Sequence, residues 1–100
     1  MRRRTEMAKR ETAELLTPAH NYAVVQLPGR QFPGVVFQGD SLSILVSDIA
    51  ELSDLLEARE YGELSDCIAE IETRLSGVLD GYEAVCKQNG LSLPYVRDEK

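Results

Sequence analysis

Histidine is almost missing from this chain, and its one occurrence, His20, stands between Ala19 and Asn21. A histidine that acts as a base or a metal ligand needs polar partners around it, and the local sequence offers none. Cysteine and histidine do not cluster at zinc-binding spacing, and no Glu-x-x-His sequence occurs. We therefore expect no metal site and no cofactor, and a turn or surface position for His20.

Cysteine is scarce as well, with Cys67 and Cys86 as its two occurrences. Both fall in a segment that we predict to be one helix, where 19 residues at a rise of ~1.5 Å place them about 28 Å apart. A disulfide requires Cα atoms within about 7 Å. The two thiols are therefore expected to be small apolar core residues in a reducing compartment.

The sequence has no long apolar run: no stretch approaches the ~18–20 consecutive apolar residues that a membrane-spanning helix needs. No apolar segment follows Arg2–Arg4 as a secretory signal requires. We predict a single cytoplasmic domain over residues 1–100, with residues 1–10 as a flexible basic tail and residues 97–100 as a second tail.

Positive charge is sparse after residue 10, where six basic residues stand against sixteen acidic ones. Residues 1–10 hold five basic residues and one glutamate, which makes +4, so the other ninety residues carry −10 of the total of −6. Nucleic-acid binding depends on neutralising phosphates with Lys and Arg. This acidic body therefore argues against a nucleic-acid partner.

Two apolar segments have the composition and length of strands, residues 22–27 and residues 35–38. Between them, residues 28–34 contain two prolines and two glycines, which belong in a loop and not in a central strand. The pattern predicts a β-hairpin with a loop of about six or seven residues.

After residue 39, the apolar residues recur at the spacing of an amphipathic helix. Asp40 or Ser41 is the expected N-cap, and the helix should run to about Glu60 with Gly62 as its stop. Its apolar residues follow spacings of three and four: Leu42, Leu45, Val46, Ile49, Leu52, Leu55 and Leu56.

A second helix is predicted over Leu64–Cys86, with an apolar stripe that repeats at heptad spacing. Asn89-Gly90 should end it, and Leu91 should close that end with an apolar contact. The short Tyr61-Gly62 connection makes the two helices antiparallel neighbours. Because the stripe is longer than one chain needs, we predict a homodimer through this helix.

Gly77 and Gly81 fall inside the second helix, where each glycine costs about 1 kcal/mol relative to alanine. A close approach by another element or by another subunit would offset that cost; in the alternative, the helix kinks or ends early there. Residues 5–16 predict a short N-terminal helix. Residues 91–96 predict a third extended segment, which Pro94 limits to an edge strand or a coil. The expected fold class is therefore α+β, a β-hairpin packed on an antiparallel helical hairpin.

The loop between the strands provides the candidate binding residues: Pro28, Arg30, Phe32 and Pro33. An arginine beside an aromatic on a stiff loop is common at interface anchors. In the alternative interpretation, Phe32 turns into the core and Arg30 pairs with a helix carboxylate.

Gly39-Asp40-Ser41-Leu42 resembles the first block of the GDSL esterases, which implies Ser41 as a nucleophile. A serine needs a base to take its proton, and in that family the base is a histidine in a C-terminal Asp-x-x-His block. Here Asp98 is followed by Glu99 and Lys100 alone, so we reject the esterase interpretation and expect a helix cap.

The longer stretch AVVQLPGRQFPGVVFQGDSL, residues 23–42, resembles a family of small uncharacterised bacterial proteins, a domain of unknown function. That resemblance implies a small bacterial cytosolic protein and no activity. We favour a non-enzymatic protein-interaction module. The alternatives are an immunity or antitoxin-like protein that binds a basic toxin, and a minimal hydrolase or small-ligand binder at Ser41.

Overall fold

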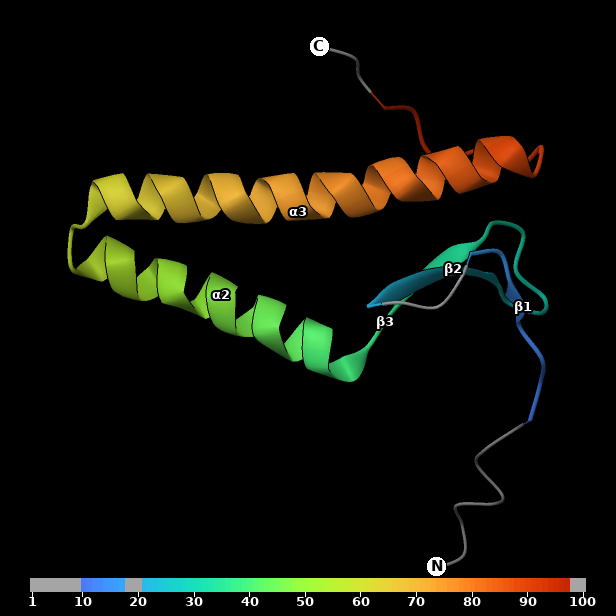
Figure 1. The fold of residues 1–100 in the computed structure, drawn as a ribbon, viewed down its shortest axis with the longest axis horizontal. Coiled ribbons are helices and arrows are strands. Elements are labelled where there is room, and N and C mark those ends of the chain that lie inside the picture. Colours follow the sequence, from blue (N-terminus) through green and yellow to red (C-terminus); the bar gives the residue numbers. More distant parts are fainter. Residues whose placement is uncertain (1–9, 18–20, 98–100) are drawn as a thin grey trace, which may run out of the picture.

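The computed structural model describes residues 10–17 and 21–97 and shows an α+β fold (Figure 1). Three strands form one antiparallel sheet, and two helices follow as an antiparallel hairpin. The elements in chain order are β1 (Glu14–Leu15), β2 (Tyr22–Gln26), β3 (Gly34–Phe37), α2 (Gly39–Glu57) and α3 (Tyr61–Gln88). The predicted β-hairpin and helical hairpin are confirmed.

The central strand of the sheet is β2. It pairs with β3 from Tyr22 opposite Phe37 to Val25 opposite Gly34. On its other edge it pairs with β1, where Leu15 lies opposite Val25. The sheet therefore has a third strand, and this strand comes from the N-terminal segment.

That origin corrects two expectations. Residues 5–9 of the predicted N-terminal helix lie outside the described residues, as do most of the predicted tails, but residues 10–16 are not helical and contain β1. Pairing with β2 prevails there over helix propensity, because so short a helix is marginal without tertiary packing. Residues 91–96 form no strand, which leaves the coil that Pro94 favours.

The seven residues between β2 and β3 begin with a type II turn. The Arg30 N–H donates to the Leu27 carbonyl over 3.3 Å, and Gly29 has a φ of 77°. Pro28 and Gly29 occupy the central positions that suit proline and glycine in this turn. The Gln26 side-chain amide also donates to the Arg30 carbonyl over 2.7 Å, so the turn is held at both ends. The predicted loop length is confirmed.

The first helix starts earlier than predicted. Its N-cap is Gln38, whose side chain makes no capping hydrogen bond. The Gln38 N–H donates to the Asn21 carbonyl over 2.9 Å, which keeps this residue in the strand ladder and makes the helix begin directly after it. Asp40 lies inside the first turn, where its Oδ1 accepts from the Ser41 N–H at 2.8 Å. The N-cap prediction was wrong, although the Asp40 carboxylate still satisfies a free donor of the first turn.

The turn between the helices is centred on Arg59, which has a φ of 60°. The Glu60 N–H donates to the Leu55 carbonyl at 2.9 Å, and the Arg59 N–H donates to the Leu56 carbonyl at 3.0 Å. These two bonds form a Schellman motif, which usually places glycine where Arg59 lies. Gly62 is in the first turn of α3, so its prediction as the helix stop was wrong.

The C-terminal end of α3 has the same closure with the expected residues. Gly90 has a φ of 67°, and the Leu91 N–H donates to the Cys86 carbonyl at 2.8 Å. The predicted end at Asn89-Gly90 is confirmed. Both helices therefore end in a Schellman motif. The residue in the left-handed conformation is Arg59 at the end of α2 and Gly90 at the end of α3.

The core lies where the sheet packs on the C-terminal half of α3. Val24 and Cys86 are fully buried there, together with Tyr82 and Val85. Tyr82 donates its hydroxyl to the Pro33 carbonyl over 2.9 Å in a buried position, which attaches the hairpin loop to the helix. We call this region the sheet end; it comprises β1–β3 and residues 78–95.

The two glycines of α3 have different surroundings. A Cβ on Gly81 would lie 2.9 Å from the Tyr22 hydroxyl, so close packing is confirmed there. Around Gly77, no atom of the described residues lies within 4 Å of such a Cβ, so no other described element of this chain packs closely there. The helix runs through both glycines without a break.

The rest of the helical hairpin, residues 42–75, forms the turn end. Figure 1 shows α2 beside the N-terminal half of α3 and the sheet beside its C-terminal half, so the elements share one layer. The radius of gyration is 17.6 Å, against about 13 Å for a compact chain of 100 residues. Domains usually stack two layers around a core, and the described residues provide one layer at the turn end.

Candidate functional site

The four predicted loop residues do not form one surface. Pro28 and Arg30 are exposed and line a shallow hollow beside the N-terminal segment. The other residues that line this hollow are Glu11, Ala13 and Leu27. Among the described residues, no ion pair involves Arg30. Phe32 is half-buried and Pro33 is buried. The outer part of the loop is therefore accessible, and its inner part belongs to the packing against Tyr82.

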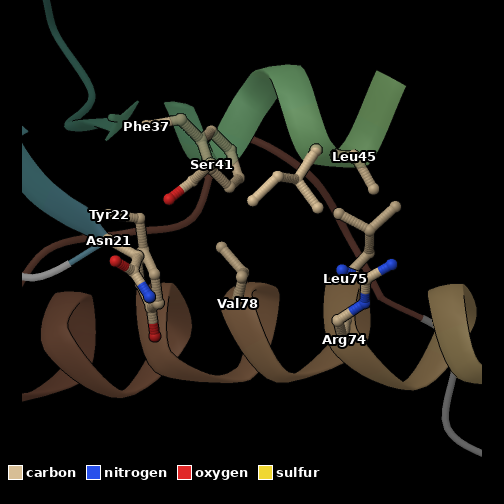
Figure 2. A pocket seen from close by; sticks show the side chains of 9 residues that line it. Asn21, Tyr22, Phe37, Ser41, Leu45, Arg74, Leu75 and Val78 are labelled. Carbon is tan, nitrogen blue, oxygen red and sulfur yellow. The ribbon is translucent and has the colours of Figure 1, made fainter. Parts of the chain in front are cut away.

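Ser41 lines a cavity of about 290 Å³ between the N-terminal part of α2 and α3. Figure 2 shows Ser41 and Leu45 on one side and Leu75 and Val78 on the other, with Tyr22 near one end. The remaining residues that line this cavity are Asn21, Phe37, Ile44 and Arg74. None of the nine has a side chain that serves as a general base at neutral pH; His20 lies outside the described residues.

One side of the helical hairpin carries carboxylates. Burial raises the pKa of the Cys67 thiol, and the nearby carboxylates raise it further. Asp48 and Arg74 bridge the helices on this side at 2.6 Å. We call it the acidic face; its carboxylates are Asp48, Glu51, Glu63, Asp66 and Glu70. The raised pKa makes Cys67 a poor thiolate nucleophile.

The other side of the helical hairpin is apolar and open. It consists of six large hydrophobic side chains that are 38–58% exposed. We call it the apolar face; its residues are Leu42, Val46, Ile49, Leu56, Ile68 and Leu75. Single exposed hydrophobic residues are normal on proteins, but a contiguous set of this kind marks an interaction surface.

Helix geometry places the two rows of the apolar face on the same side. At 100° per residue, the α2 row lies about 100–180° around the helix from the buried Leu55. The α3 row, Ile68 and Leu75, lies about 40–60° from the buried Ile71. Because the helices are antiparallel and both rotations have the same sense, the two rows turn toward one surface, on which Glu72 lies beside Ile68 and Leu75.

Sequence reasoning missed this surface because it assigned every apolar residue of α2 to one contact. The signal was present as a second row, in which Leu42, Val46, Ile49, Ser53 and Leu56 follow spacings of four and three. Together with the row of α2 that faces α3, this second row makes the apolar surface of α2 wider than packing against one neighbour requires.

Two classes of site are not found in the described ranges. Residues 10–17 and 21–97 contain no group of three or more His, Cys, Asp or Glu side chains that could hold a metal ion. None of the helices in this part of the chain combines the length and apolarity that crossing a bilayer requires.

Comparison with known proteins identifies the family and no activity. No curated protein and no solved structure matches the chain. The model of one family, described as "Family of unknown function (DUF6959)", matches residues 8–95. That range contains the whole stretch from Ala23 to Leu42 on which the sequence resemblance rests, as well as both helices. The chain therefore belongs to this family of unknown function.

Proposed function

We propose that this protein is a non-enzymatic protein-interaction module that binds through the apolar face of its helical hairpin. The observation that carries the proposal is the exposure of that face, from 38% at Leu75 to 58% at Val46. Leaving such side chains in water sacrifices about 25 cal/mol for each Å² of apolar surface. A protein partner that covers the face recovers this free energy.

We also propose that the protein associates with itself, but mainly through α2 and not through α3 as the sequence indicated. The heptad stripe of Leu64–Cys86 suggested α3 as the interface, but Ile71, Tyr82 and Val85 of that stripe are buried within the chain. We propose a homodimer in which α2 contributes most and α3 adds Ile68 and Leu75. Two such hairpins stacked on each other form a four-helix bundle, the usual solution for helices with this pattern.

The proposed role is not catalytic. Among the described residues that line the cavity beside Ser41, none is a base that would activate its hydroxyl at neutral pH, and Arg74 at the edge of the cavity is paired with Asp48 at 2.6 Å. A minimal hydrolase or small-ligand binder at Ser41 remains the alternative for this cavity. Fluorophosphonate labelling that Ser41→Ala abolishes would replace our proposal with that alternative.

The direct test is the mass of the protein in solution. At micromolar concentration, light scattering after size exclusion should give twice the chain mass for the wild type. Val46→Glu, which puts a charge in the middle of the apolar face, should give the mass of one chain. Ser47→Glu is the matched control, because Ser47 is exposed on the same helix but points away from the face, and it should stay dimeric. A wild-type monomer that captures no protein would refute the proposal.

The outer loop is a second candidate surface. Pro28 and Arg30 are accessible, and the type II turn holds them in place. We expect Arg30→Ala to weaken capture of a partner protein without changing the dimer mass. Phe32→Ala should lower the stability as well, since Phe32 is half-buried. If both variants capture partners as well as the wild type does, the loop has no binding role.

An immunity or antitoxin-like role is the second candidate, and the acidic face favours it. Its carboxylates surround Cys67 and raise the pKa of that thiol, and a negative surface steers association with a basic protein. Cys67 and Cys86 are both free thiols, which fits the cytoplasmic location that we propose. Failure to neutralise any toxin encoded beside it in the source genome would remove this candidate.

A further inference from the structure

The residues that follow α3 are attached to it mainly through their side chains. Figure 1 shows this dark red segment turning back along α3 after the helix ends. We call residues 91–97 the C-terminal strap; they form no helix or strand. Within the described part of the chain, the backbone of the strap is hydrogen-bonded at one point, where the Leu91 N–H donates to the Cys86 carbonyl at 2.8 Å. Segments near a terminus with few backbone hydrogen bonds open at low cost.

The side of the strap that faces the core is apolar. Half-buried and exposed residues alternate from Leu91 to Tyr95, as in an extended chain that lies on a surface. The half-buried ones, Leu91, Leu93 and Tyr95, pack against the buried cluster of the sheet end. The Tyr95 ring stacks on Tyr82, with ring centroids 6.5 Å apart and an interplanar angle of 23°. The strap therefore closes one side of this core.

One carboxylate holds the end of the strap. The Tyr95 hydroxyl donates to Glu83 Oε2 at 3.0 Å, and Arg97 Nη1 donates to Glu83 Oε1 at 3.0 Å. Arg97 Nη1 also donates to Asp80 Oδ1 at 2.7 Å, but the Asp80 side chain is 66% exposed and that of Glu83 is 23% exposed. Burial and the bond to Glu83 raise the pKa of Tyr95 to about 12, so its hydroxyl remains a donor at neutral pH. We call Glu83, Tyr95 and Arg97 the latch.

Helix geometry places Cys86 between the sheet and the strap. At 100° per residue, Cys86 lies about 40° around α3 from Tyr82 and about 60° from Glu83, between the two. Tyr82 is on the side of the sheet, because its hydroxyl donates to the Pro33 carbonyl, and Glu83 is on the side of the strap. Cys86 is fully buried, so it has a cover on each side.

The two covers are attached with different strength. On the sheet side, β2 pairs with β3 from Tyr22 to Val25, and the hydrogen bond between Tyr82 and Pro33 is buried. On the strap side, the ion pairs of Arg97 are partly exposed, and such pairs contribute little to stability. The strap is therefore the cover that separates first.

We propose that the C-terminal strap is a hinged cover, which pivots at Leu91 and opens as one unit while the sheet and the two helices stay folded. Opening breaks the latch, lifts Leu93 and Tyr95 from the core and gives small solutes access to Cys86. Both donors of the latch bind the same carboxylate, so they are released together. Access to this thiol thereby depends on the charge of Glu83.

Thiol reactivity in the full chain tests this opening. In a Cys67→Ser background Cys86 is the one remaining cysteine, and its reaction with dithionitrobenzoate reports how often it is uncovered. The double change Tyr95→Phe and Arg97→Ala keeps the stacked ring and removes both donors of the latch, so it should accelerate the reaction about tenfold. Glu83→Gln, which removes the charge of the latch, should act in the same direction.

Leu55→Ala is the matched control for global unfolding. Leu55 is buried at the turn end, away from the strap, so its truncation lowers the stability of the whole chain and should leave the rate at Cys86 unchanged. The milder Ile71→Val serves in the same way if Leu55→Ala does not fold. Urea unfolding of each variant gives its global stability, and far-UV circular dichroism shows that it is folded.

The outcomes separate a hinged cover from a permanently packed segment. If the turn-end variants accelerate the reaction in proportion to their loss of global stability, Cys86 is reached only through complete unfolding and the proposal fails. Unchanged reactivity in both latch variants also overturns it. A parent protein whose Cys86 reacts as fast as in urea would show that the strap does not cover the thiol.

Discussion

Helix α3 is packed in two different ways along its length. At the sheet end its side chains close a core, in which Cys86 is fully buried and Tyr82 is 5% exposed. At the turn end, Ile71 is its one buried residue among those described, and Ile68 three residues away is 46% exposed. The comparison teaches that the sheet end buries its apolar residues within the chain, whereas the turn end leaves several of its apolar residues exposed.

Two valines test this difference with the same chemical change. Val24→Ala removes methyl groups from a site with no exposure and should lower the free energy of unfolding by about 2–3 kcal/mol at any protein concentration. Val46→Ala, at 58% exposure, should cost the monomer less than about 0.5 kcal/mol but weaken dimerisation. Urea unfolding at two protein concentrations distinguishes the cases; equal losses would mean that the two ends do not differ.

The buried hydrogen bond of the sheet end should have the next largest effect. Tyr82→Phe leaves the Pro33 carbonyl without its donor, and an unsatisfied buried acceptor costs about 1–3 kcal/mol. Tyr61→Phe is the control at the turn end, where the ring is 60% exposed, and it should be neutral. If thermal unfolding shows the two variants to be equally stable, water replaces the lost donor and the sheet end is less closed than we infer.

The Schellman ends of the two helices should respond in opposite directions. Arg59→Gly relieves a left-handed conformation that costs an L-residue roughly 1 kcal/mol, so it should stabilise the turn end by about that amount. Gly90→Ala introduces the same strain at φ 67° and should destabilise the sheet end by about 1 kcal/mol. Chemical denaturation of both variants against the wild type measures the pair. Changes of the same sign would contradict the assignment.

The ion pair of the acidic face should have the smallest effect. The side chains of Asp48 and Arg74 are 38% and 41% exposed, and pairs at such exposure contribute about 0.2–1 kcal/mol. Asp48→Ala should therefore lower the unfolding free energy by no more than that, and added salt should remove the difference. A loss above 1 kcal/mol would indicate that the pair fixes the distance between the helices.

The sequence was sufficient for the elements whose pattern is local. The loop at Pro28-Gly29 and the glycine end at Gly90 follow from residue types that suit one backbone conformation. The β-hairpin follows from the composition of its two strands, and the helical hairpin follows from the spacing of apolar residues. The strand at Glu14–Leu15 was out of reach, because two residues in a run of helix formers pair with β2 for reasons of tertiary packing. Arg59 was missed for a related cause, since a glycine three residues later seemed the better stop.

The candidate site was predictable only in part. Residue type alone singled out Arg30, which is exposed, but it did not reveal that the Pro33 carbonyl accepts a hydrogen bond from Tyr82. The heptad stripe of α3 indicated a surface in need of a partner without indicating which partner. Much of that stripe is buried within the chain. More of the exposed large hydrophobic side chains of the helical hairpin lie on α2 than on α3, and this difference depends on how each helix is rotated toward the other.

The hydrogen bond from Tyr82 to Pro33 also bears on the order of folding. It joins residues 49 positions apart, whereas the contacts between α2 and α3 near Arg59 connect neighbours in sequence. Local contacts form early, and distant ones wait for a long loop to close. We therefore expect the helical hairpin to form first and the sheet to dock last, so that the core of the sheet end is completed after the turn between the helices has closed.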